Sequence, residues 1–471
     1  MKKIKLNPWL IAALAGAQCA SVGLAADNTT TGSDTDINAL QQEINDLDQK
    51  VRILERQREL DKEDAATAAT KEPTIKFDSS GFTFSSPDAN FIIGLHGLIQ
   101  LDSRTFFGEP GVKAGSDDFL LRRARPILTG TVFHNFDFNF TPDFGGSAVV
   151  IYDAYINYHY NPALQLEFGK FKSPVGLETL QSDTWLFFNE RTLANNLSPN
   201  RDIGAELHGD LFGGVASYAA GIFDGAPDYS SPTSNVDVDN NTAFAGRVFF
   251  QPAKNTDLDF LRGLGVGLSG SYEVDRGGAS GLTAGYVTDG QQKFFTYSAT
   301  AAETAGANGG HWRISPQGYY YYGPFGLIGE YLVSDQAVTS TGTGGTFSTD
   351  LDNTGWEISA GWVLTGEDDS YNGVTPKHPF NPAKGQWGAW QVVARYAELN
   401  VDHKADTATF ATAGSALTAH GWSAGINWYL NRNIRVNASF SHTQFGDLVG
   451  TASAITKQAE NTFFTRVQLA F

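Results

Sequence analysis

The chain ends on the stretch ENTFFTRVQLAF, residues 460–471. Side chains alternate across an extended strand, so every second residue shares a face. One face of this stretch is mainly apolar and carries Phe463, Thr465, Val467, Leu469 and Phe471. The other face carries Phe464, Arg466 and Gln468. A final strand that is apolar on one side and aromatic at its last residue is typical of barrels of the bacterial outer membrane.

The same period of two recurs from Phe91 onward. Within 150–160 the predicted apolar face consists of Val150, Tyr152, Ala154, Ile156, Tyr158 and Tyr160. Within 422–430 it consists of Trp422, Ala424, Ile426, Trp428 and Leu430. A soluble β-sandwich also alternates. These faces, however, end in Tyr, Trp and Phe, as lipid-facing strands do at the membrane interfaces.

We predict sixteen strands, all in the second part of the chain. They lie near 91–101, 118–132, 134–143, 148–160, 163–172, 202–212, 214–224, 241–252, 262–274, 311–323, 324–335, 353–365, 386–400, 418–430, 433–446 and 460–471. Connections after even-numbered strands are mostly short and those after odd-numbered strands mostly long, as in an outer-membrane barrel. One connection, 366–385, is long where a short turn is due.

The fold class expected is therefore all-β, a 16-stranded antiparallel transmembrane barrel with a short N-terminal coiled-coil helix. In hydrocarbon every backbone polar group needs a partner, so spanning strands must close into a ring. Sixteen strands enclose a water-filled lumen unless loops plug it. Because the lumen-facing residues are polar, the default expectation is a channel.

Residues 1–25 have the pattern of a cleaved signal peptide. Lys2, Lys3 and Lys5 precede an apolar run, and Gly23–Leu24–Ala25 resembles a cleavage site. The apolar run is too short to span a bilayer. Cys19, the one cysteine, lies within this segment. The mature chain is therefore expected to have no disulfide and no thiol chemistry, and to reside in the outer membrane.

Residues 26–75 are predicted to form a periplasmic coiled-coil segment and linker, followed by the barrel over 76–471. Apolar residues three and four apart mark a coiled-coil seam: Ile37, Leu40, Ile44, Leu47, Val51 and Leu54. The alternative is an amphipathic helix that lies on another surface. The function we expect is a trimer clamp or a spacer toward the cell wall.

Charge and motifs exclude several function classes. The formal net charge is −18, and it becomes more negative once the signal peptide is removed, which argues against nucleic acid as a partner. GVGLSG at 265–270 and GWSAG at 421–425 match the dinucleotide and nucleophile-elbow patterns. Both require a following helix, whereas here each lies within a predicted strand. The histidines lack metal-site spacing. We expect no enzyme, no cofactor and no metal.

Several stretches resemble the phosphate-selective porin O and P family. They are GLHGLIQLDSRTFF (94–107), FLLRRARPILTGTVF (119–133), the stretch 169–209 that begins GKFKSP, GPFGLIGEYLV (323–333), HPFNPAKGQWGAWQVVARYAEL (378–399) and GINWYLNRNIRVNASFSHTQF (425–445). The resemblance implies a homotrimer of barrels in outer-membrane lipid, each with its own pore. It also implies that the third extracellular loop, 173–201, folds inward with help from the fifth, 275–310.

The resemblance further implies passive passage of small anions, such as phosphate or polyphosphate, along lumenal basic residues. The matching positions are Arg123, Arg125, Lys170, Lys172, Arg191 and Arg201. Two arginines two apart on a strand share a face, and guanidinium groups can replace an anion's hydration bidentately at successive weak sites.

Other interpretations remain open at this point. The basic residues could simply pair with neighbouring carboxylates, such as Asp153, Glu167, Glu178, Asp183 or Glu190, because acidic residues are as common as basic ones over 119–205. The barrel would then be a non-selective or weakly cation-selective porin for hydrophilic solutes. A further alternative is a plugged structural or adhesin barrel tethered through the coiled coil.

Overall fold

The computed structural model describes residues 33–69, 72–108, 115–146, 148–231, 241–300, 302–406, 409–450 and 458–471. The chain divides into two compact units, one ending at Glu72 and the other running from Pro73 to Phe471. The predicted signal peptide lies outside the described residues. Among the helices described, none combines the length and the apolar character needed to cross a membrane.

The first unit contains one long helix, α1 (Ser33–Ala69, 37 residues). It continues past the apolar seam, whose last residue is Leu54, because Glu, Lys and Ala, all good helix formers, follow in the sequence. The six seam side chains are 49% to 65% exposed: Ile37, Leu40, Ile44, Leu47, Val51 and Leu54. The apolar stripe of α1 is therefore left largely uncovered in the single chain.

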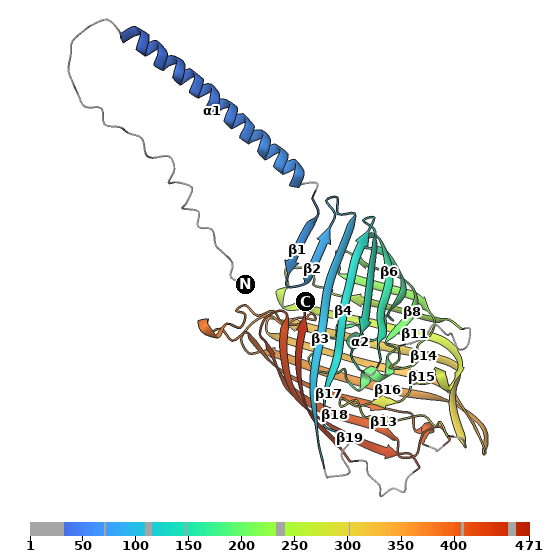
Figure 1. Ribbon diagram of the computed structural model, residues 1–471. Coiled ribbons are helices and arrows are strands. Elements are labelled where there is room, and N and C mark those ends of the chain that lie inside the picture. Colours follow the sequence, from blue (N-terminus) through green and yellow to red (C-terminus); the bar gives the residue numbers. More distant parts are fainter. Residues whose placement is uncertain are drawn as a thin grey trace. The chain divides into compact units, whose positions relative to one another are not determined.

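The second unit is a closed antiparallel barrel of 16 strands (Figure 1). The ring closes where β20 pairs with β3, from Asn461 opposite Phe107 to Ala470 opposite Leu98. In Figure 1 the blue β3 lies beside the red strands that end the chain. The strands are β3 (Phe91–Phe107), β4 (Asp118–Val132), β5 (Phe136–Asp143), β6 (Val150–Asn161), β7 (Leu164–Lys172), β8 (Arg201–Leu211), β9 (Ala216–Phe223), β10 (Ala243–Phe250), β11 (Leu264–Gly278), β14 (Glu303–Tyr322), β15 (Phe325–Gly342), β16 (Gly345–Val363), β17 (Ala389–Asn400), β18 (Ala416–Tyr429), β19 (Ile434–Leu448) and β20 (Glu460–Ala470).

A hairpin of β1 (Thr74–Asp78) and β2 (Gly81–Ser85) extends the barrel wall. β2 pairs with the first residues of β3, beyond the point where β20 ends. The last residue, Phe471, exchanges two backbone hydrogen bonds with Gly97. The absence of a side chain at Gly97 is required here, because a Cβ would lie 2.8 Å from the Phe471 ring. The end of the chain is thus fastened to its first barrel strand.

The prediction of a long loop between 335 and 353 is wrong. β15 and β16 continue as paired strands through this region to a tight turn, with Gly342 opposite Gly345. The stretch is rich in Ser, Thr, Gly and Asp, a composition that also occurs in loops. The prediction of sixteen strands holds, and the long connection between β16 and β17 (364–388) lies at the end of the barrel that otherwise has short turns.

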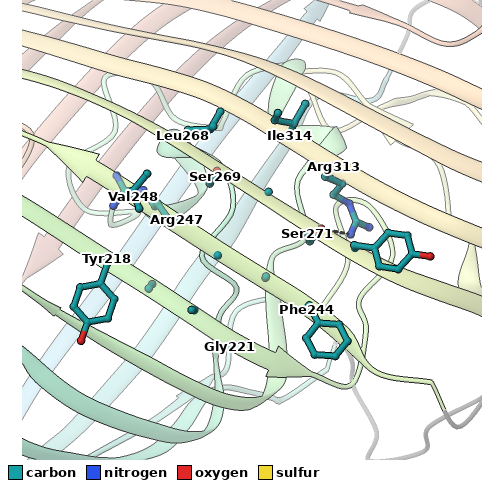
Figure 2. A pocket seen from close by; sticks show the side chains of 16 residues that line it. Tyr218, Gly221, Phe244, Arg247, Val248, Leu268, Ser269, Ser271, Arg313 and Ile314 are labelled. Atoms are coloured by element: carbon teal, nitrogen blue, oxygen red, sulfur yellow. Dashed lines mark hydrogen bonds between the residues drawn. The ribbon is translucent and has the colours of Figure 1, made fainter.

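The outer face of the barrel is apolar, as the period of two predicts. A shallow groove of about 760 Å³ crosses β9, β10, β11 and β14 on this side (Figure 2). Gly246 and Gly270 face each other across β10 and β11, and exposed Phe244, Val248 and Leu268 lie along the groove. This groove belongs to the lipid-facing wall and is separate from the interior described below.

Candidate functional site

The inward loop, residues 173–200, joins β7 to β8 and lies inside the barrel. It contains two short helices, α2 (Leu177–Leu180) and η2 (Ala194–Leu197). Most of its residues are buried, with Val175, Leu177 and Leu197 at 0% exposure. Gly355, on the lumenal face of β16, lies so close that an added Cβ would be 3.0 Å from Ala194 Cα. The described contacts of this loop are thus with the interior of the barrel wall.

A row of wall donors holds one side of the inward loop. Backbone carbonyls between Asp183 and Glu190 accept hydrogen bonds from lumenal side chains of five strands, a set of contacts that we call the carbonyl latch. The donors and acceptors are Gln100 to Asp183 (3.1 Å), Gln468 to Thr184 (3.2 Å), Arg435 to Leu186 (2.8 Å), Asn427 to Phe187 (3.0 Å), Arg466 to Asn189 (2.5 Å) and Arg395 to Glu190 (2.8 Å).

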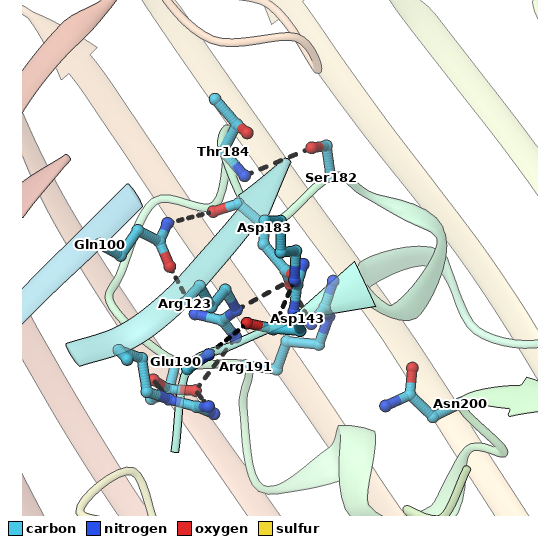
Figure 3. Close-up of polar contacts among 12 residues, drawn as sticks. Gln100, Arg123, Asp143, Ser182, Asp183, Thr184, Glu190, Arg191 and Asn200 are labelled. Atoms are coloured by element: carbon cyan, nitrogen blue, oxygen red, sulfur yellow. Dashed lines mark hydrogen bonds and ion pairs between the residues drawn. The ribbon is translucent and has the colours of Figure 1, made fainter. Parts of the chain in front are cut away.

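The carboxylates of the two residues at the ends of this segment, Asp183 and Glu190, bind arginines of the wall, and the first is Asp183 (Figure 3). Three of the predicted arginines converge on it, Arg123 at 3.2 Å, Arg125 at 2.5 Å and Arg191 at 2.5 Å. Arg125 also contacts Asp143 at 2.6 Å. Burial alone would raise the pKa of Asp183, but the guanidinium groups, led by Arg123, outweigh it and hold the pKa well below its usual 3.8.

The second anchor is Glu190. Arg122 binds it through both carboxylate oxygens, at 2.7 and 2.9 Å, and Arg466 and Arg104 approach it at 3.0 and 3.5 Å. Arg122 reaches the lumen because it is the extra residue of a β-bulge in β4. Its neighbours Arg123 and Leu121 pair with the consecutive residues Gln100 and Leu101 of β3, so Arg122 has no partner across the strands. Burial opposes ionisation of Glu190, but the arginines, led by Arg122, hold its pKa well below 4.5.

Tyr152 lies between two of the predicted basic residues. Its ring centroid is 3.6 Å from the Arg125 guanidinium carbon and 3.7 Å from that of Arg201, a double cation–π contact. The prediction that Tyr152 faces lipid is therefore wrong. A bulge in β6, where Thr141 pairs with Asp153 and Pro142 with Ile151, makes Tyr152 the extra residue and shifts the alternation. Arg201 also contacts Asp153 at 3.1 Å.

The two predicted lysines lie apart from the carboxylate anchors. Lys172 ends β7, and its Nζ donates to the carbonyls of Leu180 (3.1 Å) and Gln181 (2.8 Å). Lys170 lies two residues earlier on β7, opposite Ala154 of β6 and Ile203 of β8. The structure thus brings four of the six predicted residues together around Asp183 and Tyr152: Arg123, Arg125, Arg191 and Arg201.

The connection between β11 and β14 also enters the barrel, as the resemblance implied for the fifth loop. It carries a small hairpin of β12 (Tyr286–Val287) and β13 (Lys293–Phe295). Asp289 contacts Arg395 of β17 at 2.6 Å. Glu460 of β20 accepts hydrogen bonds from Thr288 Oγ1 (2.8 Å) and Gly290 N (3.1 Å). This loop is therefore fixed to the strands that also carry the carbonyl latch.

The long connection 364–388, between β16 and β17, contacts the inward loop. The Tyr371 hydroxyl donates to the Leu177 carbonyl of the inward loop (2.7 Å), and Gln181 Nε2 donates to the Tyr371 carbonyl (2.8 Å). Buried Asp369 accepts from Gln391 at 2.8 Å, in space left by Gly326, where a Cβ would collide with its carboxylate. The unexpected length of this turn therefore corresponds to a segment packed against the inward loop.

A cavity of about 220 Å³ remains beside β7, β8, β9 and β10. Lys172 and Arg247 both line it, together with Glu206, His208 and other residues. Arg247 has no ion pair within 4.0 Å among the described residues. Its Nε donates to Gln317 at 3.0 Å, and its guanidinium lies 4.4 Å from the Phe249 ring centroid. The wall of this cavity thus carries two basic side chains, Lys172 and Arg247, that no described carboxylate contacts within 4.0 Å.

Sequence reasoning did not include seven buried or lumenal arginines of the described residues among the site residues: Arg104, Arg122, Arg247, Arg313, Arg395, Arg435 and Arg466. For all of them except Arg122 the period of two was a usable signal. Arg466 shares a face with Gln468 in the last strand, and Arg104 and Arg247 likewise fall on the polar faces of β3 and β10. Arg122 falls on the lipid face by that rule, and only the bulge brings it inside.

Comparison with known proteins identifies the group to which this architecture belongs. The profile of the phosphate-selective porin O and P family matches residues 93–471. Porin O of Pseudomonas aeruginosa is 26% identical over 391 residues, covering 76% of this chain and 84% of its own. The outer membrane channel DcaP of Acinetobacter baumannii shares the fold, with a TM-score of 0.53, 11% identity, and coverage of 83% of this chain and 100% of its own. The chain is an outer-membrane porin and belongs to the phosphate-selective porin O and P family.

Proposed function

We propose that this porin is a passive channel with a preference for small anions such as phosphate or polyphosphate, and that Lys172 and Arg247 provide this preference. The observation that supports it is the cavity beside β7–β10, where both cations lie without a direct carboxylate partner. A cation in a narrow aqueous space raises the local concentration of anions. Glu206 and Asp210 line the same space, so we expect the preference to be modest.

We assign a different role to Arg123, Arg125, Arg191 and Arg201. Their charges are directed at Asp183, Asp143 and Asp153 at 2.5 to 3.2 Å. A guanidinium that already binds a carboxylate has fewer donors left for a passing ion. In the proposal these residues hold the inward loop in position, and the loop in turn narrows the path past Lys172.

The test is ion selectivity in a planar bilayer under a KCl gradient. We expect the wild type to favour chloride, and Lys172→Gln and Arg247→Gln each to lower the anion-to-cation permeability ratio. A unit charge 4 Å from the path contributes about 1 kcal/mol in water, which corresponds to roughly a fivefold change in the permeability of each ion, upward for the anion and downward for the cation. Phosphate should inhibit the chloride current of the wild type more strongly than that of the double variant.

Arg262→Gln is the matched control, because Arg262 is exposed between β10 and β11 and pairs with Asp259 at 2.6 Å. It should leave the ratio unchanged. A cation-selective wild type, or an equal ratio in wild type and double variant, would falsify the assignment. No conductance, together with no swelling of liposomes in small sugars, would instead favour the plugged barrel.

We further propose that the porin is a homotrimer and that α1 contributes through its apolar seam. The seam is half-exposed or more in the single chain, and heptad spacing favours association with identical helices. Replacing Ile44 and Leu47 with Asn should lower the temperature at which the detergent-solubilised oligomer dissociates on a gel. Replacing Gln42 and Gln49, on the opposite side of the heptad, with Asn is the control. Equal dissociation temperatures in both variants would exclude this role for the helix.

A further inference from the structure

Three glutamates from separate parts of the chain meet inside the barrel. Glu178 comes from α2 in the inward loop, Glu330 from β15 and Glu357 from β16. Glu330 and Glu357 are direct cross-strand neighbours. One carboxylate oxygen from each residue lies within 4.8 Å of the other two, and all three residues are at most 6% exposed. We call them the glutamate cluster.

Like charges directly opposite one another destabilise a sheet, and a buried carboxylate without a counter-charge is costly. Within the described residues, none of the three lies within 4.0 Å of a basic group. The nearby Arg395 is directed elsewhere, to Asp289 at 2.6 Å and to the Glu190 carbonyl at 2.8 Å. The glutamate cluster therefore lacks a positive partner that contacts it.

The hydrogen bonds of the cluster leave acceptor capacity unused. Glu330 accepts from the backbone N–H groups of Leu177 (2.7 Å) and Glu178 (3.3 Å). Glu178 Oε2 accepts from Thr192 N and Oγ1 at 2.8 and 3.0 Å. Glu357 Oε2 accepts from Ser359 at 2.7 Å, but Glu357 Oε1 is buried and has no donor among the described residues. A buried oxygen that no donor reaches indicates that something else satisfies it.

We propose that the glutamate cluster is a binding site for a divalent cation of the calcium type. Calcium binds carboxylate oxygens at about 2.3–2.6 Å, so ligands on opposite sides of one ion lie about 4.6–5.2 Å apart. The upper limit of 4.8 Å in the cluster fits that span. Magnesium needs shorter, octahedral bonds and keeps most of its water, so a cluster of three carboxylates favours calcium.

The position of the site gives the cation a structural consequence. Glu178 belongs to the inward loop, whereas Glu330 and Glu357 belong to β15 and β16, two strands of the wall that supply no donor to the carbonyl latch. A cation held by all three carboxylates fastens the loop to a second part of the wall. It also offsets negative charge in the interior. The inference goes beyond anion preference, because that preference rests on Lys172 and Arg247 and does not require a metal.

The experiment is calcium titration by calorimetry on the full-length protein, in detergent free of lipopolysaccharide and after EDTA treatment. We expect one tight calcium per chain in the wild type, with weaker binding of magnesium. Glu357→Gln keeps the shape and removes one charged ligand, so it should weaken calcium binding about tenfold or more. Glu206→Gln removes a half-buried carboxylate of β8 outside the cluster and should keep wild-type affinity for calcium.

A second measurement is the thermal unfolding of the wild type and of two variants. Calcium that binds the folded state raises the unfolding temperature, so the barrel should melt higher in calcium than in EDTA, and this gain should be smaller in Glu357→Gln and Glu178→Gln. Absence of tight binding, or equal affinity in wild type and Glu357→Gln, overturns the proposal. A melting temperature that responds to pH but not to calcium also overturns it, because protons would then be what neutralises the cluster.

Discussion

Asp183 combines two functions in one residue of the inward loop. Its carboxylate contacts Arg123, Arg125 and Arg191, and its backbone carbonyl is the first acceptor of the carbonyl latch. It is 4% exposed, so its charge is compensated by these arginines rather than by water. The arginines depend on it in turn, since without it Arg191 would keep only carbonyl partners.

Asp183→Asn should loosen the inward loop. Removing one partner of a buried ion pair costs about 3–5 kcal/mol because the remaining charges stay buried. We expect larger and noisier single-channel currents in planar bilayers, and faster proteolysis within 173–200. Asp257→Asn, at an exposed position between β10 and β11, is the control and should behave as wild type. Currents of normal size and noise in Asp183→Asn would show that the carboxylate does not hold the loop.

At the scale of elements, the connection 364–388 packs against the inward loop through Tyr371. Asp369 lies in it, 5% exposed, with Gln391 as its side-chain donor. Burial raises its pKa from 3.8 to about 7. Because the pKa is higher in the packed than in the free segment, the stabilisation of the protonated form is complete below about pH 4 and is lost as the pH rises toward 7.

The packing of 364–388 should therefore weaken as the pH rises from about 4 to about 7, by up to about 4 kcal/mol over the whole titration. The check is the rate of cleavage near Lys377 and Lys384 by a protease active across this range, such as proteinase K. Cleavage should be faster at pH 8 in the wild type and much less pH-dependent in Asp369→Asn. A pH dependence that persists in the variant would assign the effect to another group.

At the scale of the whole molecule, the barrel is a ring whose seam joins the first and last strands. Phe471 is bonded to Gly97, and its ring lies edge-on to Phe82 of β2 at 6.3 Å. All these contacts lie at the end of the wall, away from the carbonyl latch. We therefore assign Phe471 to insertion and closure, and the residues of the interior to transport.

Deleting Phe471 should reduce the amount of heat-modifiable, folded barrel in outer membranes, measured by gel shift. The pores that do assemble should keep the single-channel conductance and the anion-to-cation ratio of the wild type, because β3, β20 and the inward loop retain their other contacts. A changed conductance in the surviving pores would mean that the chain end also shapes the channel.

The barrel was predictable because alternation and closure are repeated constraints. Each strand from Phe91 to Phe471 carries its own period of two, and membrane burial forbids an open edge. The predicted face of a side chain was wrong where one inserted residue shifts the alternation along the strand. The bulges at Arg122 and Tyr152 each insert a residue, which moves a side chain to the other face. The alternation of apolar and polar residues within a single strand does not indicate such an insertion.

Only part of the candidate site could be predicted from the sequence, because Arg247 was not among the predicted residues and the contacts depend on the fold. RRAR and FKSP indicated the basic positions, yet their partners depend on the path of the inward loop, which spacing does not specify. Asp183 and Glu190 are ordinary acidic residues in the sequence, and Glu178, Glu330 and Glu357 meet only after the chain has closed into a ring.

The carbonyl latch has a consequence for the order of assembly. Its donors lie on β17, β18, β19, β20 and β3, so a loop from the middle of the chain is gripped by strands from both chain ends. During synthesis the inward loop exists long before β19 and β20. Until those strands have joined the sheet, the inward loop can contact the arginines of β4 but lacks the donors of the carbonyl latch, and we expect it to narrow the interior less. The inward loop therefore reaches its final position when the last strands join the barrel. A barrel that lacks these strands should be distinguishable from the finished porin by a larger conductance.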